Sequence, residues 1–228
     1  MAPVVEVRGL NYRYEDGTIA LRGVDFRLNA GESVALLGPN GSGKTTFILH
    51  LNGLLWGDGD VVVCGLRLDK SSAPMVRRKM GMVFQDSETQ LFMPTVIDDV
   101  SFGPLNAGVD AHQAAERALA ALERVGMSAA AARAPYHLSA GEKKRVAIAG
   151  VLAMEPEILV LDEPTTFLDP PAQRELQSLL SGLPQAKLVV THDLRFADAL
   201  CSRAAFFREG KIVAEGTVAE LMRRFEWD

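Results

Sequence analysis

The stretch GPNGSGKTT, residues 38–46, constrains the fold of this chain more than any other segment. It matches the pattern G-x-x-x-x-G-K-[ST], directly after the apolar run SVALLG and directly before a helical pattern. Glycines in such a loop let consecutive backbone N–H groups turn toward one anion, and the following helix adds its positive N-terminal end. The stretch therefore predicts a phosphate-binding loop that joins a strand to a helix.

This loop supplies the first candidate ATP-binding residues: Gly38, Pro39, Asn40, Gly41, Ser42, Gly43, Lys44, Thr45 and Thr46. We expect Lys44 to reach the β- and γ-phosphates, Thr45 to offer its hydroxyl to Mg²⁺, and Thr46 to hold a phosphate oxygen. The alternative is a glycine-rich turn that only connects a strand to a helix. Because the spacing is complete and both flanks are present, we favour the phosphate site.

The rest of the chain alternates apolar runs with helical patterns. Runs rich in β-branched residues predict strands at 4–7, 24–28, 33–38, 61–65, 80–85, 157–163 and 187–192. Helical patterns follow at 43–54, 170–183 and 194–200. Strand alternating with helix predicts a layered α/β core. The strands at 33–38, 157–163 and 187–192 end abruptly in glycine or polar residues, as buried parallel strands do when their ends carry a site.

The region 95–154 is rich in alanine and helical in period, without a convincing strand. We interpret it as a helical lobe, running from about residue 98 to about residue 150, inserted in the α/β core. At 228 residues the chain fits one domain with this lobe attached, so residues 1–228 form a single predicted domain.

Composition narrows the class of protein. Hydrophobic residues make up 48% and charged residues 23%, which is typical of a soluble globular chain. No apolar run approaches the roughly 20 residues of a membrane helix, and the N-terminus has no basic segment before a long apolar run, so we expect a cytoplasmic location. The net charge of −5 and the scattered basic residues argue against nucleic acid as a partner. Cys64 and Cys201 match no metal spacing.

Two carboxylates end the strand at 157–163. An acidic residue at the end of a buried strand suits the binding of Mg²⁺ through water, and we assign this role to Asp162. Glu163 is the predicted group that polarises the attacking water during hydrolysis. The alternative is that Glu163 caps the next helix or pairs with a surface base.

The segment YHLSAGEKKRVAIAG, residues 136–150, begins a basic, alanine-rich helix at an unusual tip. Ser139 and Glu142 form S-x-x-E, which predicts a capping box. The capping box does not explain Gly141, which permits close approach of a phosphate to the backbone.

Together these segments resemble the ATP-binding cassette ATPases. The segment at 136–150 is similar to the signature motif of that family, normally LSGGQ, from which Ala140 and Glu142 depart. Gln85 resembles the Q-loop glutamine, Asp169 the D-loop aspartate and His192 the switch histidine. Tyr14 stands where the family has an aromatic that stacks on adenine, although Tyr12 is a rival on the same strand face.

The resemblance implies an antiparallel β subdomain beside the P-loop core and two copies arranged head to tail. Ser139, Gly141 and Glu142 of one copy would then complete the ATP site of the other, and Asp169 would bridge the copies. His192 would contact the γ-phosphate, and Gln85 would sense Mg²⁺ and transmit closure. ATP and Mg²⁺ are the implied ligands.

The segment 83–108 resembles, more closely, the ATPases of energy-coupling-factor importers, especially those of the cobalt and nickel branch. Gln90, the following Leu91-Phe92 and the FGPLN run carry this resemblance. It implies peripheral attachment at the cytoplasmic face of the membrane, through a groove that grips a helix of an integral membrane subunit, with Leu91, Phe92 and Met93 as exposed anchors.

Several alternatives stay open at this point. The anchors could pack in the core of the lobe instead, with Phe92 the most uncertain. Cobalt, nickel, biotin or another vitamin could be the cargo, because substrate choice lies in other subunits. Two other functional classes remain: a soluble cassette ATPase that acts on DNA or ribosomes, and a nucleotide-binding regulator without turnover. The relatives' C-terminal extension is expected to be missing, which predicts a weak dimer without ATP.

Overall fold

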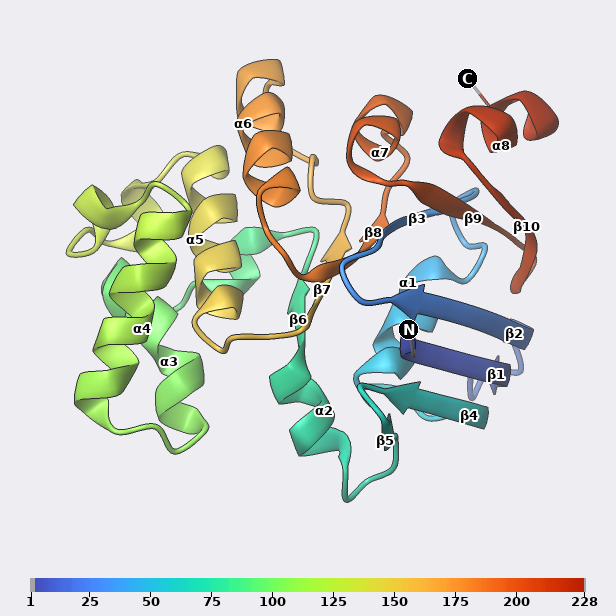
Figure 1. Ribbon diagram of the computed structural model, residues 1–228, viewed down its shortest axis with the longest axis horizontal. Helices are drawn as coiled ribbons and strands as arrows, with labels where there is room; N and C mark the ends of the chain where they lie inside the picture. The colour runs from blue at the N-terminus through green and yellow to red at the C-terminus, as the bar shows by residue number, and fades with distance from the viewer. Residues whose placement is uncertain (1–2, 228) are drawn as a thin grey trace.

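Two sheets organise the computed structural model, which describes residues 3–227 (Figure 1). The first has the strand order β2-β1-β4-β5 and is antiparallel. Its strands are β1 (Pro3–Arg13), β2 (Ile19–Asn29), β4 (Asp58–Val63) and β5 (Leu66–Arg67). This sheet is the antiparallel subdomain that the family resemblance implied.

The second sheet has the strand order β10-β9-β3-β8-β7-β6. Its strands are β3 (Ser33–Leu37), β6 (Met80–Val83), β7 (Ile158–Asp162), β8 (Ala186–Val190), β9 (Arg203–Arg208) and β10 (Lys211–Gly216). All neighbours pair in parallel except β9 and β10. Because parallel strands point the same way, the ends of β3, β6, β7 and β8 lie at one edge of the sheet. The predicted α/β class, with a mixed and largely parallel sheet, is therefore confirmed.

The strands of this sheet contribute side chains to two hydrophobic cores, one on each face, because successive side chains of a strand point to opposite faces. On β7, Leu159 and Leu161 pack with helices α5, α6 and α7, whereas Ile158 and Val160 pack with α1 and the antiparallel sheet. Both faces are therefore covered, and every residue of β7 and β8 is buried. This explains why the two strands appear in the sequence as continuous apolar runs.

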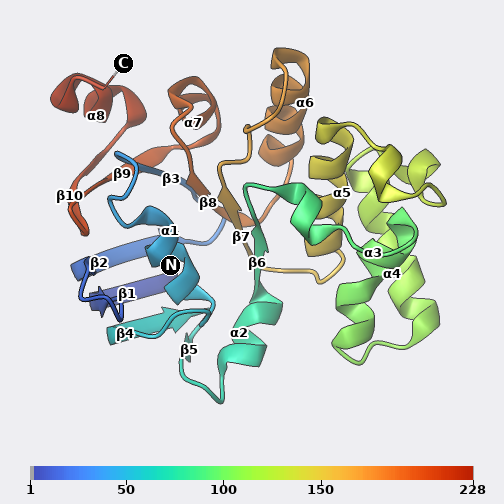
Figure 2. The same cartoon turned by 180° about the vertical axis from the view of Figure 1, so that it is seen from behind.

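The helices of the core are α1 (Lys44–Leu51), α2 (Ala73–Lys79), α6 (Pro170–Ser181), α7 (Leu194–Leu200) and α8 (Val218–Phe225). The lobe consists of α3 (Val96–Asn106), α4 (Ala111–Arg124) and α5 (Ala140–Leu152). Short 3₁₀ helices lie at Ser87–Gln90, Ser128–Ala130 and Pro135–His137. The lobe lies beyond the edge strand β6, on the side away from the antiparallel sheet (Figures 1 and 2). Its helices span residues 96–152, against a predicted range of about 98 to about 150, and residues 1, 2 and 228 lie outside the described part.

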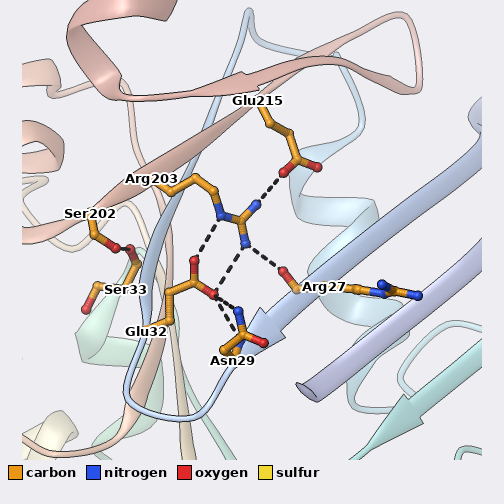
Figure 3. Close-up of polar contacts among 7 residues, drawn as sticks. All are labelled: Arg27, Asn29, Glu32, Ser33, Ser202, Arg203 and Glu215. Carbon is orange, nitrogen blue, oxygen red and sulfur yellow. Dashed lines mark hydrogen bonds and ion pairs between the residues drawn. The ribbon is translucent and has the colours of Figure 1, made fainter. Parts of the chain in front are cut away.

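Arg203 connects the two sheets (Figure 3). Its guanidinium donates to the carboxylate of Glu32, in the turn between β2 and β3, at 2.9 Å, and to the carbonyl of Arg27 on β2 at 2.7 Å. It also pairs with Glu215 on β10. The pKa of the Glu32 carboxyl is held below its ordinary value; burial opposes this, while the Arg203 and Asn29 hydrogen bonds produce it. The cluster fixes the antiparallel sheet relative to the sheet that carries the phosphate loop.

Candidate functional site

The phosphate loop takes a backbone path that only glycine permits at two of its positions. Gly38 has a φ of 137°, and a Cβ there would lie 2.1 Å from the carbonyl oxygen of Phe207. Gly43 has a φ of 109°, and a Cβ there would lie 2.6 Å from the carbonyl oxygen of Ala20. At each position, the positive φ and the nearby carbonyl oxygen both exclude any residue that carries a Cβ. The loop is therefore held in its turn by the strand β9 and the strand β2 that back it.

Lys44, the first residue of α1, is buried, and its ammonium donates to the carbonyls of Gly38 at 2.7 Å and Pro39 at 3.1 Å. The ammonium is thus curled back over the loop. Burial lowers the pKa of Lys44, while the nearby carboxylates Glu163 and Asp162 act to raise it. A bound phosphate could replace these two backbone carbonyls as the hydrogen-bond partner of the Lys44 ammonium.

A cleft of about 610 Å³ opens above the loop, and we call it the ATP cleft. It has the size of a small-molecule site. Four of its fifteen lining residues come from β2, the hairpin before it and the end of β8: Thr18, Ile19, Ala20 and Val190. The others were all predicted site residues: Tyr14, Asn40, Gly41, Gly43, Lys44, Thr45, Thr46, Gln85, Asp162, Glu163 and His192. Gly38, Pro39 and Ser42 lie in the loop beneath them.

Glu163 and His192 contact each other in the cleft, with the His192 Nδ1 2.9 Å from a carboxylate oxygen of Glu163. The same oxygen accepts from the His192 backbone N–H at 3.3 Å. Glu163 has a φ of 46°, a left-handed conformation uncommon outside glycine, and such strain often occurs at functional sites. His192 is 67% exposed, so this contact is also the one expected if Glu163 pairs with a surface base, and that alternative stays open.

Asp162 is buried at the end of β7. Burial, and then the charge of Glu163, raise its pKa to about 6, while Lys44 and Lys144 act to lower it. Its carboxylate, the Thr45 hydroxyl and the Gln85 amide oxygen all belong to the lining of the cleft. These are hard oxygen donors of the kind that Mg²⁺ takes, together with water and phosphate. The donor set fits the implied metal.

Tyr14 and Tyr12 occupy different places. The Tyr14 hydroxyl lies 2.9 Å from the Thr46 hydroxyl, and Tyr14 lines the ATP cleft. Tyr12 packs edge-on against His50, with ring centroids 4.6 Å apart, and lines a neighbouring hollow instead. Of the two rivals, Tyr14 is the one beside the phosphate loop.

Ser139 and Glu142 lie outside the cleft, at the start of α5 in the lobe. The predicted capping box is confirmed: the Ser139 backbone N–H donates to Glu142 at 2.8 Å, and the Glu142 N–H donates to the Ser139 hydroxyl at 3.3 Å. Gly141 has a structural role as well, because a Cβ there would lie 3.2 Å from the Cβ of Ala172 on α6. Residues 139–142, which we call the tip, are therefore held in place by the capping box and by the close approach of Gly141 to α6.

Asp169 also lies outside the cleft. Its carboxylate accepts from the Ala172 N–H at 2.9 Å and so caps α6 at its N-terminus. Two residues before it, Phe167 is 76% exposed and has a φ of 66°. The sequence analysis did not single out Phe167. Its place in the sequence, an aromatic four residues after Glu163 and two before Asp169, was the available signal; its left-handed backbone is known only from the structure.

The three predicted anchors differ in exposure. Phe92 is 63% exposed and packs edge-on against Phe102 of α3, with ring centroids 5.0 Å apart. Leu91 is half-buried and packs against the core of the lobe, so its prediction as an exposed anchor is wrong. Met93 is half-buried. The backbone of Phe92 and Met93 donates to the buried Asp99 carboxylate at 3.0 Å each, which holds this turn on α3.

Two searches of the described residues, 3–227, were negative. None of the helices is long and apolar enough to cross a membrane. No group of three or more His, Cys, Asp and Glu residues gathers there as a metal site.

Comparison with solved structures gives close matches. Clostridium perfringens cbiO1, part of the ABC transporter complex cbiONQ, matches with a TM-score of 0.89 at 36% identity, over 99% of this chain and 93% of that one. A dimeric post-hydrolysis state of the ATP-binding cassette MJ0796, bound to ADP and Pi, matches with a TM-score of 0.82 at 29% identity, over 94% and 98% of the two chains. The predicted P-loop cassette fold is thus confirmed.

Sequence comparison agrees. A Streptomyces avermitilis protein provisionally named as an ABC transporter ATP-binding protein is 54% identical over 97% of this chain and 85% of its own length. The energy-coupling factor transporter ATP-binding protein EcfA of Methanothermobacter thermautotrophicus is 47% identical over 98% of this chain and 74% of its own. The ABC transporter family model matches residues 21–166. The chain belongs to the ABC transporter family, and it resembles the ATP-binding subunits of energy-coupling-factor transporters.

Proposed function

We propose that this chain hydrolyses ATP and energises an importer of the energy-coupling-factor type, for which cobalt is the first candidate cargo. The proposal of hydrolysis rests on the 2.9 Å contact between Glu163 and His192, in a cleft that is also lined by the phosphate loop. A nucleotide-binding regulator would need the loop alone. A carboxylate paired with a histidine, next to a second carboxylate, is the arrangement that an attacking water requires.

Each residue has a role in this proposal. The loop amides and Lys44 hold the β- and γ-phosphates, and Tyr14 stacks on adenine once its hydroxyl leaves Thr46. Glu163 accepts a hydrogen bond from water and takes its proton, while His192 orients Glu163 and contacts the γ-phosphate. Thr45, Gln85 and Asp162 would hold Mg²⁺, which would supply positive charge beside the phosphates.

One copy of the chain does not bring every predicted residue to the ATP cleft, because Ser139, Gly141 and Glu142 lie outside it. A second copy, placed head to tail, would supply its own tip to this cleft in a twofold pair. The surface between them would include Asp169 and the exposed Phe167. Closure on ATP excludes water, and phosphate release reopens the pair.

The exposed aromatic pair Phe92–Phe102 is the proposed contact for a membrane subunit. With Leu105, which is exposed on the same helix α3, it forms an apolar patch on the lobe. Such anchors suit the apolar face of a partner helix. The names of the EcfA and cbiO1 relatives support an integral membrane partner, attachment at the cytoplasmic face, and a cargo of cobalt; nickel, biotin and another vitamin are the alternatives.

Three measurements test the proposal. The purified chain should release phosphate from ATP only when Mg²⁺ is present; binding without turnover would leave only the regulator. Co-expression with the membrane subunits should then support uptake of radiolabelled cobalt more than nickel or biotin. Phe92→Asp should abolish co-purification with those subunits and keep Mg²⁺-dependent turnover. Leu119→Asp is a matched control, because Leu119 is an exposed apolar residue on α4 of the same lobe.

A further inference from the structure

Lys144, on the first turns of α5, is a buried lysine that no role above uses. It is 2% exposed. Its ammonium donates to the carbonyl of Gln85 at 2.9 Å and to the carbonyl of Phe84 at 3.3 Å. Burial lowers the pKa of Lys144 to about 8, while the charges of Asp86 and Asp162 act to raise it. A desolvated ammonium is costly, so this lysine carries an energetic penalty that a methionine of similar length would avoid.

Of the two residues whose carbonyls Lys144 binds, Gln85 lines the ATP cleft and Phe84 directly precedes it. They follow β6, which is an edge strand, so one side of this backbone lacks a neighbouring strand. Gln90 covers that side: its amide accepts from the Phe84 N–H at 2.9 Å and donates to the Met82 carbonyl at 3.2 Å. Gln90 belongs to the same loop as Gln85. Lys144 instead reaches the loop from the lobe.

Lys144 is also near the tip that the proposed pair would present to the other copy. It lies on α5 five positions after Ser139, the N-cap, and three after Gly141. Since α5 is a continuous helix from Ala140 to Leu152, a shift of the tip moves the Lys144 ammonium with it. The ammonium therefore joins the loop of one ATP cleft to the tip that serves the other.

We propose that Lys144 is a positioning residue that couples the two ATP sites of the pair, by fixing the Gln85 backbone to the helix that carries the tip. This rests on the two-copy arrangement proposed above. When ATP orders Gln85 in one cleft, the ammonium transmits that order to the tip, and the second cleft closes more readily. Lys144 is not among the residues that line the ATP cleft, so we assign it a positioning role and not a catalytic one.

A purely structural lysine offers the matched control. Lys187 is 3% exposed, and its ammonium donates to the carbonyls of Leu183 at 2.6 Å and Gln185 at 2.9 Å, after the end of α6. Burial lowers its pKa as well. It thus has the same chemistry as Lys144 without a link to the cleft. Changing either lysine to methionine should alter the melting temperature. Only the change at Lys144 should alter the coupling between the two ATP sites.

The experiment compares wild type, Lys144→Met, Lys144→Arg and Lys187→Met in Mg-ATP turnover and in binding of a fluorescent ATP analogue. Lys144→Met should reduce kcat by about tenfold or more, as loss of a hydrogen bond to a charged group predicts, and lower the Hill coefficient for ATP toward one. Its Kd for the analogue should stay within about threefold of wild type, because the phosphate loop is intact. Lys144→Arg should restore cooperativity, and Lys187→Met should keep it.

Unchanged kcat and Hill coefficient in Lys144→Met would overturn the inference, and so would an equal loss in Lys187→Met. If Lys144→Met does not fold, Lys144→Gln replaces it with the same expected loss of cooperativity, and full cooperativity there refutes the coupling. Absence of turnover in the wild-type chain would overturn the proposed function, and the inference with it. Normal turnover with an unaffected Lys144→Met would overturn the inference alone.

Discussion

Replacing Glu163 with glutamine should separate ATP-driven closure from hydrolysis. The amide keeps the size and a hydrogen-bond acceptor but cannot take a proton from water. Loss of a positioned general base costs about a hundredfold to ten-thousandfold in rate, which is about 3–5 kcal/mol of transition-state stabilisation. Because Glu163 does not bind the phosphates in the proposed arrangement, ATP should still bind and close the pair.

The fold should survive this change. Glu163 is only 12% exposed, but its partner His192 is 67% exposed, so solvent screens the contact from the His192 side. A pair of this kind contributes at most about 1 kcal/mol, which shifts the melting temperature of a chain of this size by about 2–4 °C. Glutamine also tolerates the left-handed backbone as glutamate does. A loss of rate larger than about tenfold would therefore not come from unfolding.

Phosphate release and light scattering after size exclusion, each at saturating Mg-ATP, measure the two effects. We expect turnover near background together with a stable dimer. Glu155→Gln is the control, because Glu155 has a φ of 54° and pairs with Arg117 at 3.1 Å outside the cleft. Turnover within tenfold of wild type would refute Glu163 as the base. A monomer at saturating Mg-ATP would refute closure of this isolated subunit.

Four further predictions concern the phosphate loop, the tip of α5 and the contacts of Arg203 and Glu32 between the two sheets. Gly43→Ala should abolish binding of an ATP analogue and lower the melting temperature, because its Cβ would lie 2.6 Å from the Ala20 carbonyl in a disfavoured conformation. Glu142→Gln should keep turnover within about threefold of wild type, because the amide oxygen can still accept the capping hydrogen bond; loss of all turnover would reveal a further role. Arg203→Met should lower the free energy of unfolding by about 2–4 kcal/mol in denaturant titrations and leave the Kd for ATP unchanged. The depressed pKa of Glu32 means that its contribution to stability is fully present above its ordinary pKa of 4.5 and is lost as the pH falls through the lower folded value. Glu32→Gln should therefore flatten the acid limb of the unfolding free energy, and an unchanged limb would show that another carboxyl dominates it.

The sequence predicted the parallel core well because its strands are buried on both faces. A continuous apolar run such as 157–163 has one interpretation once a phosphate loop and helical patterns surround it. Strands β9 and β10 were missed. Within β9, Arg203 and Arg208 flank the apolar Ala204–Phe207, and β10 alternates weakly, so tertiary pairing rather than local pattern determines both.

The candidate site likewise contains residues that the sequence predicts and residues whose placement only the fold reveals. Residues that follow directly from a strand end, such as Asp162 and Glu163, were predicted from position and lie in the cleft. The choice between Tyr14 and Tyr12 could not be made, because both belong to one strand pattern and only the fold shows that Tyr12 packs on His50. Leu91 was assigned an exposed position because a short apolar run does not reveal which of its side chains the lobe covers.

The tip of α5 raises a final point about charge. A carboxylate at Glu142, in place of the usual amide, would oppose the triphosphate of a facing copy. The structure pairs that charge within the lobe: Arg133 donates to Glu142 at 3.2 Å and to the His137 carbonyl at 2.9 Å. The Ser139 backbone N–H, with a smaller contribution from Arg133, lowers the pKa of Glu142. The Glu142 carboxylate of the tip therefore already has partners. The hydrogen bond from the Glu142 N–H to the Ser139 hydroxyl is long, at 3.3 Å, so another acceptor could replace the hydroxyl. In the proposed pair, a phosphate approaching the tip would compete for Ser139 and the helix N-terminus rather than for the Arg133–Glu142 pair, so we expect Glu142 to be tolerated there.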